Sequence, residues 1–315
     1  DRADIAALAP RPPPHTEPER ISLLGDEWRI VRAGHHDIGT YLGLAEAIAG
    51  DPTPAIMADV SSRIAFVRGA IADAGERPRF DAWVARVFRP ALDRIGIEPK
   101  PADSDDVNNM RGTLLLMLGG DADVQRRVRA MALRYLDDAN ALPPSLVAAV
   151  LQAAAAAGDA ALYDRYVATM QASIAKPEEY YRFFNSLAAF ADPALRSRTL
   201  AFALKDARSQ DTPLLLGQLL GSDMDTTWAF IRTNWQALAE RLGTFQAMPY
   251  IVGSLGNGCS AASSADIKTF FDAHPVAEAA RALQQAQERI ASCVAVDERQ
   301  SAPFAKWLSA HSSNQ

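Results

Sequence analysis

The sequence predicts an all-α protein, built as a curved α-solenoid of HEAT- or armadillo-like antiparallel helix pairs. Three observations carry this prediction. Apolar residues recur at three- and four-residue steps, Gly, Pro and Asp interrupt that pattern regularly, and the sequence lacks alternating β patterns of useful length. The segments between interruptions span roughly 10–20 residues, which is the usual length of globular helices. We therefore expect about sixteen helices joined by short loops, with neighbours running antiparallel.

The helical period is clearest in the first half of the chain. A first helix is expected from Ile21 onward, because four apolar residues share one of its faces. These four are Ile21, Leu24, Trp28 and Val31, and the same spacing is found in Ile64, Val67 and Ile71, in Trp83, Val87, Ala91 and Ile95, and in Met110, Leu114 and Met117. Abundant alanine, which has the highest helix propensity, supports further helices along the rest of the chain.

The interruptions have the chemistry of helix ends. Many combine a Gly that ends one helix with an Asp or Ser that caps the next, and Pro often follows in the first turn. They fall at Gly34, Gly50–Pro52, Gly75, Gly96–Pro101, Gly119–Asp121, Leu142–Pro144, Gly158–Asp159, Lys176–Pro177, Asp192–Pro193, Gln210–Pro213, Gly221–Asp223, Leu242–Gly243, Gly253–Gly258 and His274–Pro275.

Residues 1–19 are expected to form a Pro-rich strap that enters from a preceding domain, and residues 20–315 one helical solenoid domain. Although 315 residues would suffice for about two globular domains, stacked helix pairs share one continuous core, so we expect one. The chain starts at Asp1 without a charged-then-apolar leader, and it is interpreted as a processed product or an excised piece of a longer protein.

Composition and charge exclude several classes of protein. Apolar residues make up 49% and charged residues 22% of the chain, which is typical of a folded protein rather than a disordered one. The formal net charge is −6, whereas a general nucleic-acid binder normally carries a basic excess. Apolar runs long enough for a membrane span are missing. We therefore expect no nucleic-acid or membrane partner.

Two motifs resemble metal ligands, and each also has a simpler interpretation. His35-His36-Asp37 lies at a helix junction, where adjacent side chains diverge by about 100°, so a solvated loop with Asp37 as N-cap is favoured. Asp103-Ser104-Asp105-Asp106 is a carboxylate cluster of the kind that binds magnesium. Because it precedes a helix, interaction of acidic first-turn residues with the helix dipole is favoured over a metal site.

The remaining chemical signals are weak. Gly253–Gly258 superficially resembles a phosphate loop, but it follows no predicted strand and precedes no Gly-Lys-Ser/Thr, so an inter-helix turn is favoured. Trp228, Phe230 and Trp235 have the spacing of helix-core residues. The sequence contains no His-Glu-x-x-His zinc motif. We therefore assign this chain no catalytic residue, metal ligand or cofactor.

Two cysteines flank the expected turn at His274-Pro275 at similar distances. If the segments 264–273 and 276–293 fold back as an antiparallel hairpin, Cys259 and Cys293 arrive at the same end. We predict that they form a disulfide, which would contribute about 3–4 kcal/mol in the chain-entropy model. A disulfide favours an oxidising location, periplasmic or secreted. The alternative is two unrelated buried thiols, with a cytoplasmic location.

Several stretches follow one another, over about 290 residues, in the order of a known family pattern. They are Arg20–Trp28 with Val31–Gly34, Ile95–Lys100 with Asp106 and Met110-Arg111, Gln210-Asp211 with Trp228–Trp235, and Phe270-Phe271 with His274-Pro275 and Trp307-Leu308. Together they resemble the C-terminal helical domain of gluzincin zinc aminopeptidases, a group that includes puromycin-sensitive aminopeptidase and the endoplasmic-reticulum aminopeptidases. In two places the sequence departs from the family pattern: Ile97 stands where Trp is usual, and Gly25 stands where the first acidic residue of the opening helix is usual.

The resemblance implies a non-catalytic role for this chain. In such enzymes a separate thermolysin-like domain carries the zinc and the general base, and a small β-sandwich precedes the helical domain. The helical domain covers the active site, restricts access and helps to bind the peptide substrate. Arg20, Arg111 and Arg182 are candidates for substrate-facing cations by side-chain type, since guanidinium groups bind a peptide carboxylate well.

Three functional hypotheses follow. The favoured one is the chamber-forming domain of a zinc metallo-aminopeptidase, with the catalytic and β-sandwich domains of the same polypeptide and a peptide as partners. The second is a free-standing helical-repeat scaffold that binds other proteins. The third is a helical enzyme that uses Asp103–Asp106 with a divalent metal. Whether the chain itself is an enzyme stays open at this point, although the favoured hypothesis places the hydrolase activity in the parent protein.

Overall fold

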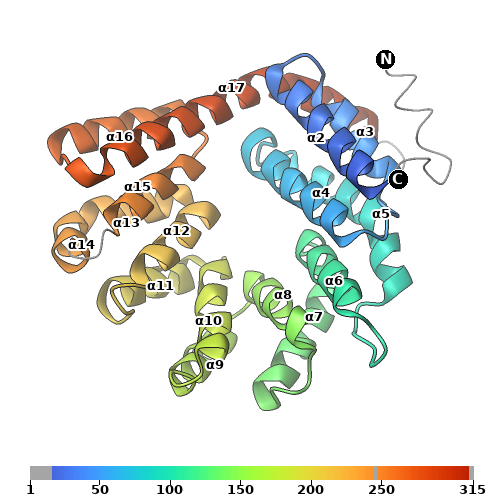
Figure 1. Ribbon diagram of the computed structural model, residues 1–315, viewed down its shortest axis with the longest axis horizontal. Helices are drawn as coiled ribbons and strands as arrows, with labels where there is room; N and C mark the ends of the chain where they lie inside the picture. The colour runs from blue at the N-terminus through green and yellow to red at the C-terminus, as the bar shows by residue number, and fades with distance from the viewer. Residues whose placement is uncertain (1–15, 244–246, 312–315) are drawn as a thin grey trace. The chain divides into compact units, whose positions relative to one another are not determined.

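The computed structural model describes residues 16–243 and 247–311, and this part of the chain is helical and contains no strand (Figure 1). These residues form sixteen α-helices, α2 to α17, which confirms the predicted all-α class and helix number. Short 3₁₀ or π-helical turns adjoin four of them: η1 (Val67–Ile71), η2 (Leu187–Ala189), η3 (Leu255–Asn257) and η4 (Ala277–Ala279).

The chain divides into two compact units, of which unit 1 comprises the described residues up to Ala153 and from Val296 onward, and unit 2 comprises Ala154–Ala295. The helices of unit 1 are α2 (Glu17–Ala33), α3 (Ile38–Ala47), α4 (Pro54–Phe66), α5 (Arg77–Ile95), α6 (Asp105–Met117), α7 (Ala122–Asp137) and most of α8 (Pro144–Ala156). Those of unit 2 are α9 (Ala160–Ala172), α10 (Pro177–Ser186), α11 (Pro193–Lys205), α12 (Thr212–Ser222), α13 (Met224–Thr233), α14 (Trp235–Leu242), α15 (Met248–Ser254) and α16 (Ala261–Ala273). The long helix α17 (Ala280–His311) contributes its first part to unit 2 and its last part to unit 1.

The strap predicted over residues 1–19 lies outside the described residues up to residue 15. The chain enters α2 at Glu17, slightly ahead of the predicted boundary at residue 20. The reason is a capping box, in which the Thr16 backbone N–H donates to the Glu19 carboxylate at 2.6 Å. Pro18 sits in the first turn, where its fixed φ suits the helix.

Side chains one repeat apart confirm the predicted stacking of helix pairs. Hydrogen bonds repeatedly join helices that are second neighbours in the chain, at sequence separations from 27 to 40 residues. The Asp105 carboxylate of α6 accepts a hydrogen bond from the Ser145 hydroxyl of α8. The hydroxyls of Tyr163 in α9 and Thr199 in α11 are hydrogen-bonded to each other. Arg196 of α11 forms an ion pair with Asp223 at the start of α13. Regular contacts between second-neighbour helices are typical of the stacked helix pairs of a solenoid.

The corner between α2 and α3 is closed by a residue from the far end of the chain. Gly34 ends α2 in the left-handed conformation, at φ 82°, which only glycine adopts without strain. The buried Gln300 of α17 accepts a hydrogen bond from the Ile38 backbone N–H at 2.9 Å, and its amide donates to the carbonyls of Val31 at 2.9 Å and His36 at 3.0 Å. One side chain therefore satisfies the end of α2 and the start of α3 together.

The last part of α17 also completes the aromatic core of unit 1. The Trp307 ring lies 5.0 Å from Trp83, and the Phe304 ring lies 5.3 Å from Phe80, both in edge-on geometry. Gly39 of α3 faces Trp307 so closely that an added Cβ would lie 2.5 Å from the indole ring. The N-terminal helices therefore pack on residues that lie more than 250 positions away in the chain, as the separation of 262 between Ile38 and Gln300 shows.

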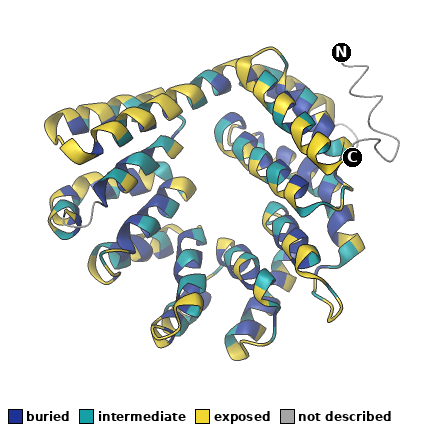
Figure 2. Ribbon diagram, viewed as in Figure 1, coloured by how far each residue is buried: buried dark blue, intermediate teal, exposed yellow. Residues whose placement is uncertain are grey.

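Unit 2 has its own aromatic and leucine core. Tyr166 of α9 lies 5.2 Å from Phe183 and 5.6 Å from Phe190, measured between ring centroids. Helix α12 buries seven of its eleven residues, among them Leu215 and Leu219 (Figure 2). Trp228, Phe230 and Trp235 were predicted to be core residues; Trp228 and Trp235 are buried against Phe270 and Phe271, and Phe230 is half-buried. Across residues 16–243 and 247–311, no helix combines the length and the apolarity needed to cross a bilayer.

We predict that Gln300→Ala destabilises the chain by about 3 kcal/mol, because the buried Ile38 N–H loses its acceptor and the carbonyls of Val31 and His36 each lose a donor. Urea unfolding followed by circular dichroism measures the change. Gln284→Ala, on the exposed surface of the same helix, is the matched control and should shift stability by less than about 0.5 kcal/mol. Equal unfolding midpoints for the two variants would contradict the assigned role.

Candidate functional site

Arg20, the first of the three arginines predicted to face a substrate, lies at the start of α2. Its Nε lies 2.8 Å from the Asp51 carboxylate, and one of its terminal nitrogens donates to the Thr53 hydroxyl at 3.1 Å. The side chain keeps 17% of its surface exposed. The guanidinium thus ties α2 to the loop before α4 and still reaches solvent.

Arg111, the second predicted cation, is fully buried in α6. Its guanidinium donates to the carbonyls of Ile95 and Gly96, at 3.2 and 2.8 Å, and lies 2.6 Å from the Asp103 carboxylate. The guanidinium also donates a hydrogen bond to the side-chain oxygen of Asn108. A substrate carboxylate would have to displace these partners, so the surroundings of Arg111 support a structural role.

Arg182, the third predicted cation, lies on α10. It pairs with Glu178 at 2.6 Å and with Glu179 at 3.2 Å, both one turn earlier on the same helix, and 18% of its side chain is exposed. The three predicted arginines make no contact with one another in the part of the chain that the structure describes. Each is held by acidic or carbonyl groups close to it.

The Asp103–Asp106 cluster caps α6, which is the interpretation that the sequence favours. Ser104 is the N-cap residue, and its hydroxyl accepts from the Val107 backbone N–H at 3.3 Å. Asp105 and Asp106 lie in the first turn, while Asp103 turns away to Arg111. Within the part of the chain that the structure describes, no group of three or more His, Cys, Asp or Glu side chains is placed to hold a metal ion.

The His35-His36-Asp37 junction is a partly exposed turn that leads into α3, as predicted, and it also makes a contact that was not predicted. Asp37 is the N-cap residue of α3, but its side chain makes no capping hydrogen bond. His36 instead lies 2.9 Å from the carboxylate of Glu27, which is only 5% exposed. The imidazole therefore satisfies a buried carboxylate, which sequence spacing alone does not reveal.

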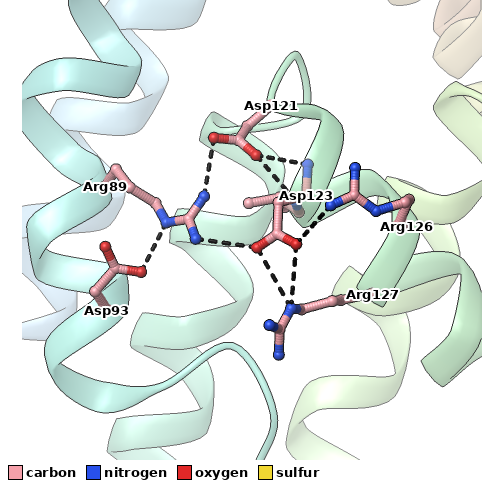
Figure 3. A network of polar contacts seen from close by, with 7 residues as sticks. Arg89, Asp93, Asp121, Asp123, Arg126 and Arg127 are labelled. Carbon is pink, nitrogen blue, oxygen red and sulfur yellow. Dashed lines mark hydrogen bonds and ion pairs between the residues drawn. The ribbon is translucent and has the colours of Figure 1, made fainter.

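A polar network that was not predicted from the sequence surrounds Arg89 of α5 (Figure 3). The guanidinium contacts Asp93 on its own helix at 2.7 Å, Asp121 at the N-cap of α7 at 2.9 Å, and Asp123 in the first turn of α7 at 3.1 Å. Asp123 also pairs with Arg126 and Arg127. The spacing of Arg89 and Asp93 was a visible signal, but the partners on α7 become apparent only after folding.

The network shifts the titration of its members. The hydrogen bond to Asp93 raises the pKa of the Arg89 guanidinium. Burial alone would raise the pKa of Asp121, but the backbone N–H groups of Val124 and Asp123 and the Arg89 guanidinium outweigh it, so the pKa lies below its usual value. Arg89 and Asp121 are therefore held in their charged forms, which suits a structural clamp rather than proton transfer.

The predicted disulfide is confirmed. Cys259 and Cys293 are joined, with their Cα atoms 5.2 Å apart, and the bond links the start of α16 to α17. The turn at His274-Pro275 folds these two helices into a hairpin, as the sequence predicted. The glycine-rich segment Gly253–Gly258 forms the end of α15 and the turn η3, so it is an inter-helix connection.

These surroundings assign no reaction to the described residues. The predicted cations and the Arg89 network are neutralised by carboxylates within their own unit, and their geometry joins helices. Chemically, Arg20 in unit 1 and Arg182 in unit 2 each present a partly exposed guanidinium held by neighbouring carboxylates.

Comparison with known proteins finds one family along almost the whole chain. The model of the ERAP1-like C-terminal domain family matches residues 1–292. Aminopeptidase M1-D of Oryza sativa subsp. japonica is 22% identical over 284 residues, which cover 86% of this chain and 32% of the relative. Aminopeptidase M1-C from the same plant is 23% identical over 288 residues, with the same coverage. The chain thus spans about a third of the length of the curated relatives that it matches.

We predict that the Asp103–Arg111 pair makes the free energy of unfolding decrease as the pH falls into the acid range. The Lys100 backbone N–H, and then the Arg111 guanidinium, lower the pKa of the Asp103 carboxyl. A lowered pKa means that the carboxylate stabilises the fold above its ordinary pKa of about 4 and loses this contribution as the pH falls through the folded value.

Thermal unfolding of the wild type and of Asp103→Asn tests this prediction. The variant should melt below the wild type at about pH 7, and the gap should narrow progressively as the pH falls below about 4. Asp26→Asn removes the exposed pair with Arg29 and is the control, with little effect at either pH. A gap that stays constant over this range would contradict the assigned role of the carboxylate.

Proposed function

The chain belongs to the ERAP1-like C-terminal domain family, and we propose that it is the non-catalytic C-terminal domain of a zinc-dependent aminopeptidase. The family match over residues 1–292 carries this proposal. The relatives named as aminopeptidases are about three times as long as the region that this chain matches, which leaves room for a separate catalytic part. The described residues offer no set of side chains that fits a zinc ion, so the zinc would be held by another part of the polypeptide.

In the parent protein, zinc would activate the water that hydrolyses the N-terminal peptide bond. The helical domain would cover the active site, restrict access to it and bind the distal part of the peptide. Stacked helices tied by ion pairs supply a stiff wall for this purpose. Catalytic and β-sandwich domains of the same polypeptide and a peptide substrate are the partners that we propose.

Arg20 and Arg182 are the substrate-facing residues that we retain in the proposal. Each keeps part of its guanidinium surface exposed, and each is oriented by carboxylates that a peptide carboxylate would join or replace. Arg111 was assigned to the same role, but its complete burial supports a structural one.

The proposal predicts how the isolated chain and the parent behave. The 315-residue chain alone should show no turnover of an aminoacyl p-nitroanilide or of a ten-residue peptide, because it lacks the zinc-bearing part. In the full polypeptide, Arg182→Ala should raise KM for the long peptide by about tenfold and leave the p-nitroanilide kinetics unchanged, since the short substrate does not reach the wall.

Arg29→Ala, which removes a cation that is 78% exposed in unit 1, is the matched control and should change neither substrate. Peptidase activity of the isolated chain would overturn the proposed function as a whole. An unchanged KM for the long peptide would remove Arg182 from the proposal and leave the family role intact.

We further propose a periplasmic or secreted location, because the disulfide needs an oxidising compartment to form. Cells that express the natural gene should contain Cys259 and Cys293 in oxidised form. Trapping with a thiol-reactive maleimide before lysis, followed by mass spectrometry, should leave both cysteines unlabelled unless a reductant is added. Labelling of both cysteines without reductant would favour the cytoplasmic alternative.

A further inference from the structure

The α16–α17 hairpin of unit 2 has an unusually thin core. Between residues 261 and 295 only Ile267, Phe271, Ala279, Ala286 and Ile290 are buried, whereas α12 buries seven of eleven residues. Figure 2 shows the contrast, with α16 and the first part of α17 mostly exposed. Apolar burial is the main stabilising contribution to folding, so this hairpin receives less of it than the helices before it.

The exposed side of the hairpin is polar or small. Its exposed residues include Lys268, Asp272, Gln284, Gln285 and Glu288. An apolar patch would indicate a surface that another protein covers, but this one is suited to water. The thin core is therefore a property of the hairpin itself.

Polar contacts hold the hairpin to the turn that precedes it and join its two helices to each other. The Arg289 guanidinium of α17 donates to the Gly253 carbonyl and packs against Gly256, whereas Gln287 of α17 donates to the Ser264 carbonyl of α16 at 3.1 Å. The disulfide between Cys259 and Cys293 adds a covalent tie at the same end. Both cysteines are only half-buried, which leaves the sulfurs within reach of a small thiol.

We propose that the Cys259–Cys293 disulfide is a redox latch on residues 259–295, and that its reduction lets this hairpin unfold locally while the rest of unit 2 stays folded. A hairpin with little buried apolar surface depends on the cross-link, because the cross-link restricts the chain in the open state. Helices α9, α10 and α12 have leucine and aromatic cores that involve neither cysteine and no residue of the hairpin. Helices α13 and α14 do contact the hairpin, through Trp228 and Trp235 on Phe270 and Phe271, so we expect their contacts to loosen with it. This inference goes beyond the proposed function, because it concerns the redox conditions under which residues 259–295 stay folded.

The chemistry of the latch is thiol–disulfide exchange with a dithiol reductant. A thiolate of the dithiol attacks one sulfur and breaks the protein's S–S bond, giving a mixed disulfide and one protein thiolate. The second thiol of the reductant then attacks the mixed disulfide. Cys259 and Cys293 end as two thiols, and the dithiol ends as its own disulfide, with two electrons transferred.

Hydrogen exchange of the 315-residue chain, with and without dithiothreitol, tests the latch. Thiol counting under denaturing conditions establishes that reduction is complete. Amides of residues 261–295 should exchange about 100-fold faster or more after reduction. Amides of α12 serve as the internal reference and should not change.

The double variant Cys259→Ser with Cys293→Ser is the matched control. It should show fast hairpin exchange without reductant and no response to dithiothreitol. Unchanged hairpin exchange in the reduced wild type would overturn the proposal. Equal acceleration in α12 would overturn it too, because unit 2 would then open as a whole.

Discussion

The fold depends on bonds between helices that are second neighbours in the chain. An α-helix pair cannot bury its apolar face alone, so each pair must be held against the next one. In this protein arginines do much of the holding: Arg89 reaches the N-cap and first turn of α7, and Arg196 reaches the N-cap carboxylate of α13. These N-cap positions combine the positive end of a helix dipole with a carboxylate that caps it. One acidic residue thereby begins a helix and anchors its neighbour.

The fold class was predictable from the sequence because helix caps and helix-ending residues act on the backbone within a few residues of themselves. Helices begin after three N-cap residues near which the sequence predicted a helix start: Ser104, Asp159 and Asp192. The cysteine pair was also predictable, since a hairpin with similar arms brings both ends together. The start of α2 was misplaced by a few residues, because proline was interpreted as extended chain although it also suits a first helical turn.

The polar interior was not predictable from spacing. Nothing in the pattern around Arg111 distinguishes a fully buried guanidinium from a surface one, since its carbonyl partners belong to the end of the preceding helix. Glu27 and His36 are nine residues apart and pair only because α2 turns at Gly34. The Arg89 clamp and the Gln300 contact likewise join residues that the helical period treats as independent. For this reason the sequence indicated the wall of helices but not which cations in it stay accessible.

The participation of the last part of α17 in unit 1 bears on how the chain matures during translation. Residues 154–295 form a compact unit from one continuous stretch, and they can fold once that stretch has left the ribosome. Helices α3 and α5 are synthesised before that stretch, yet Gln300, Phe304 and Trp307 can reach them only after it has been made. Unit 1 is thus begun before unit 2 and completed after it, and until then the apolar face that the last part of α17 covers stays open to a chaperone.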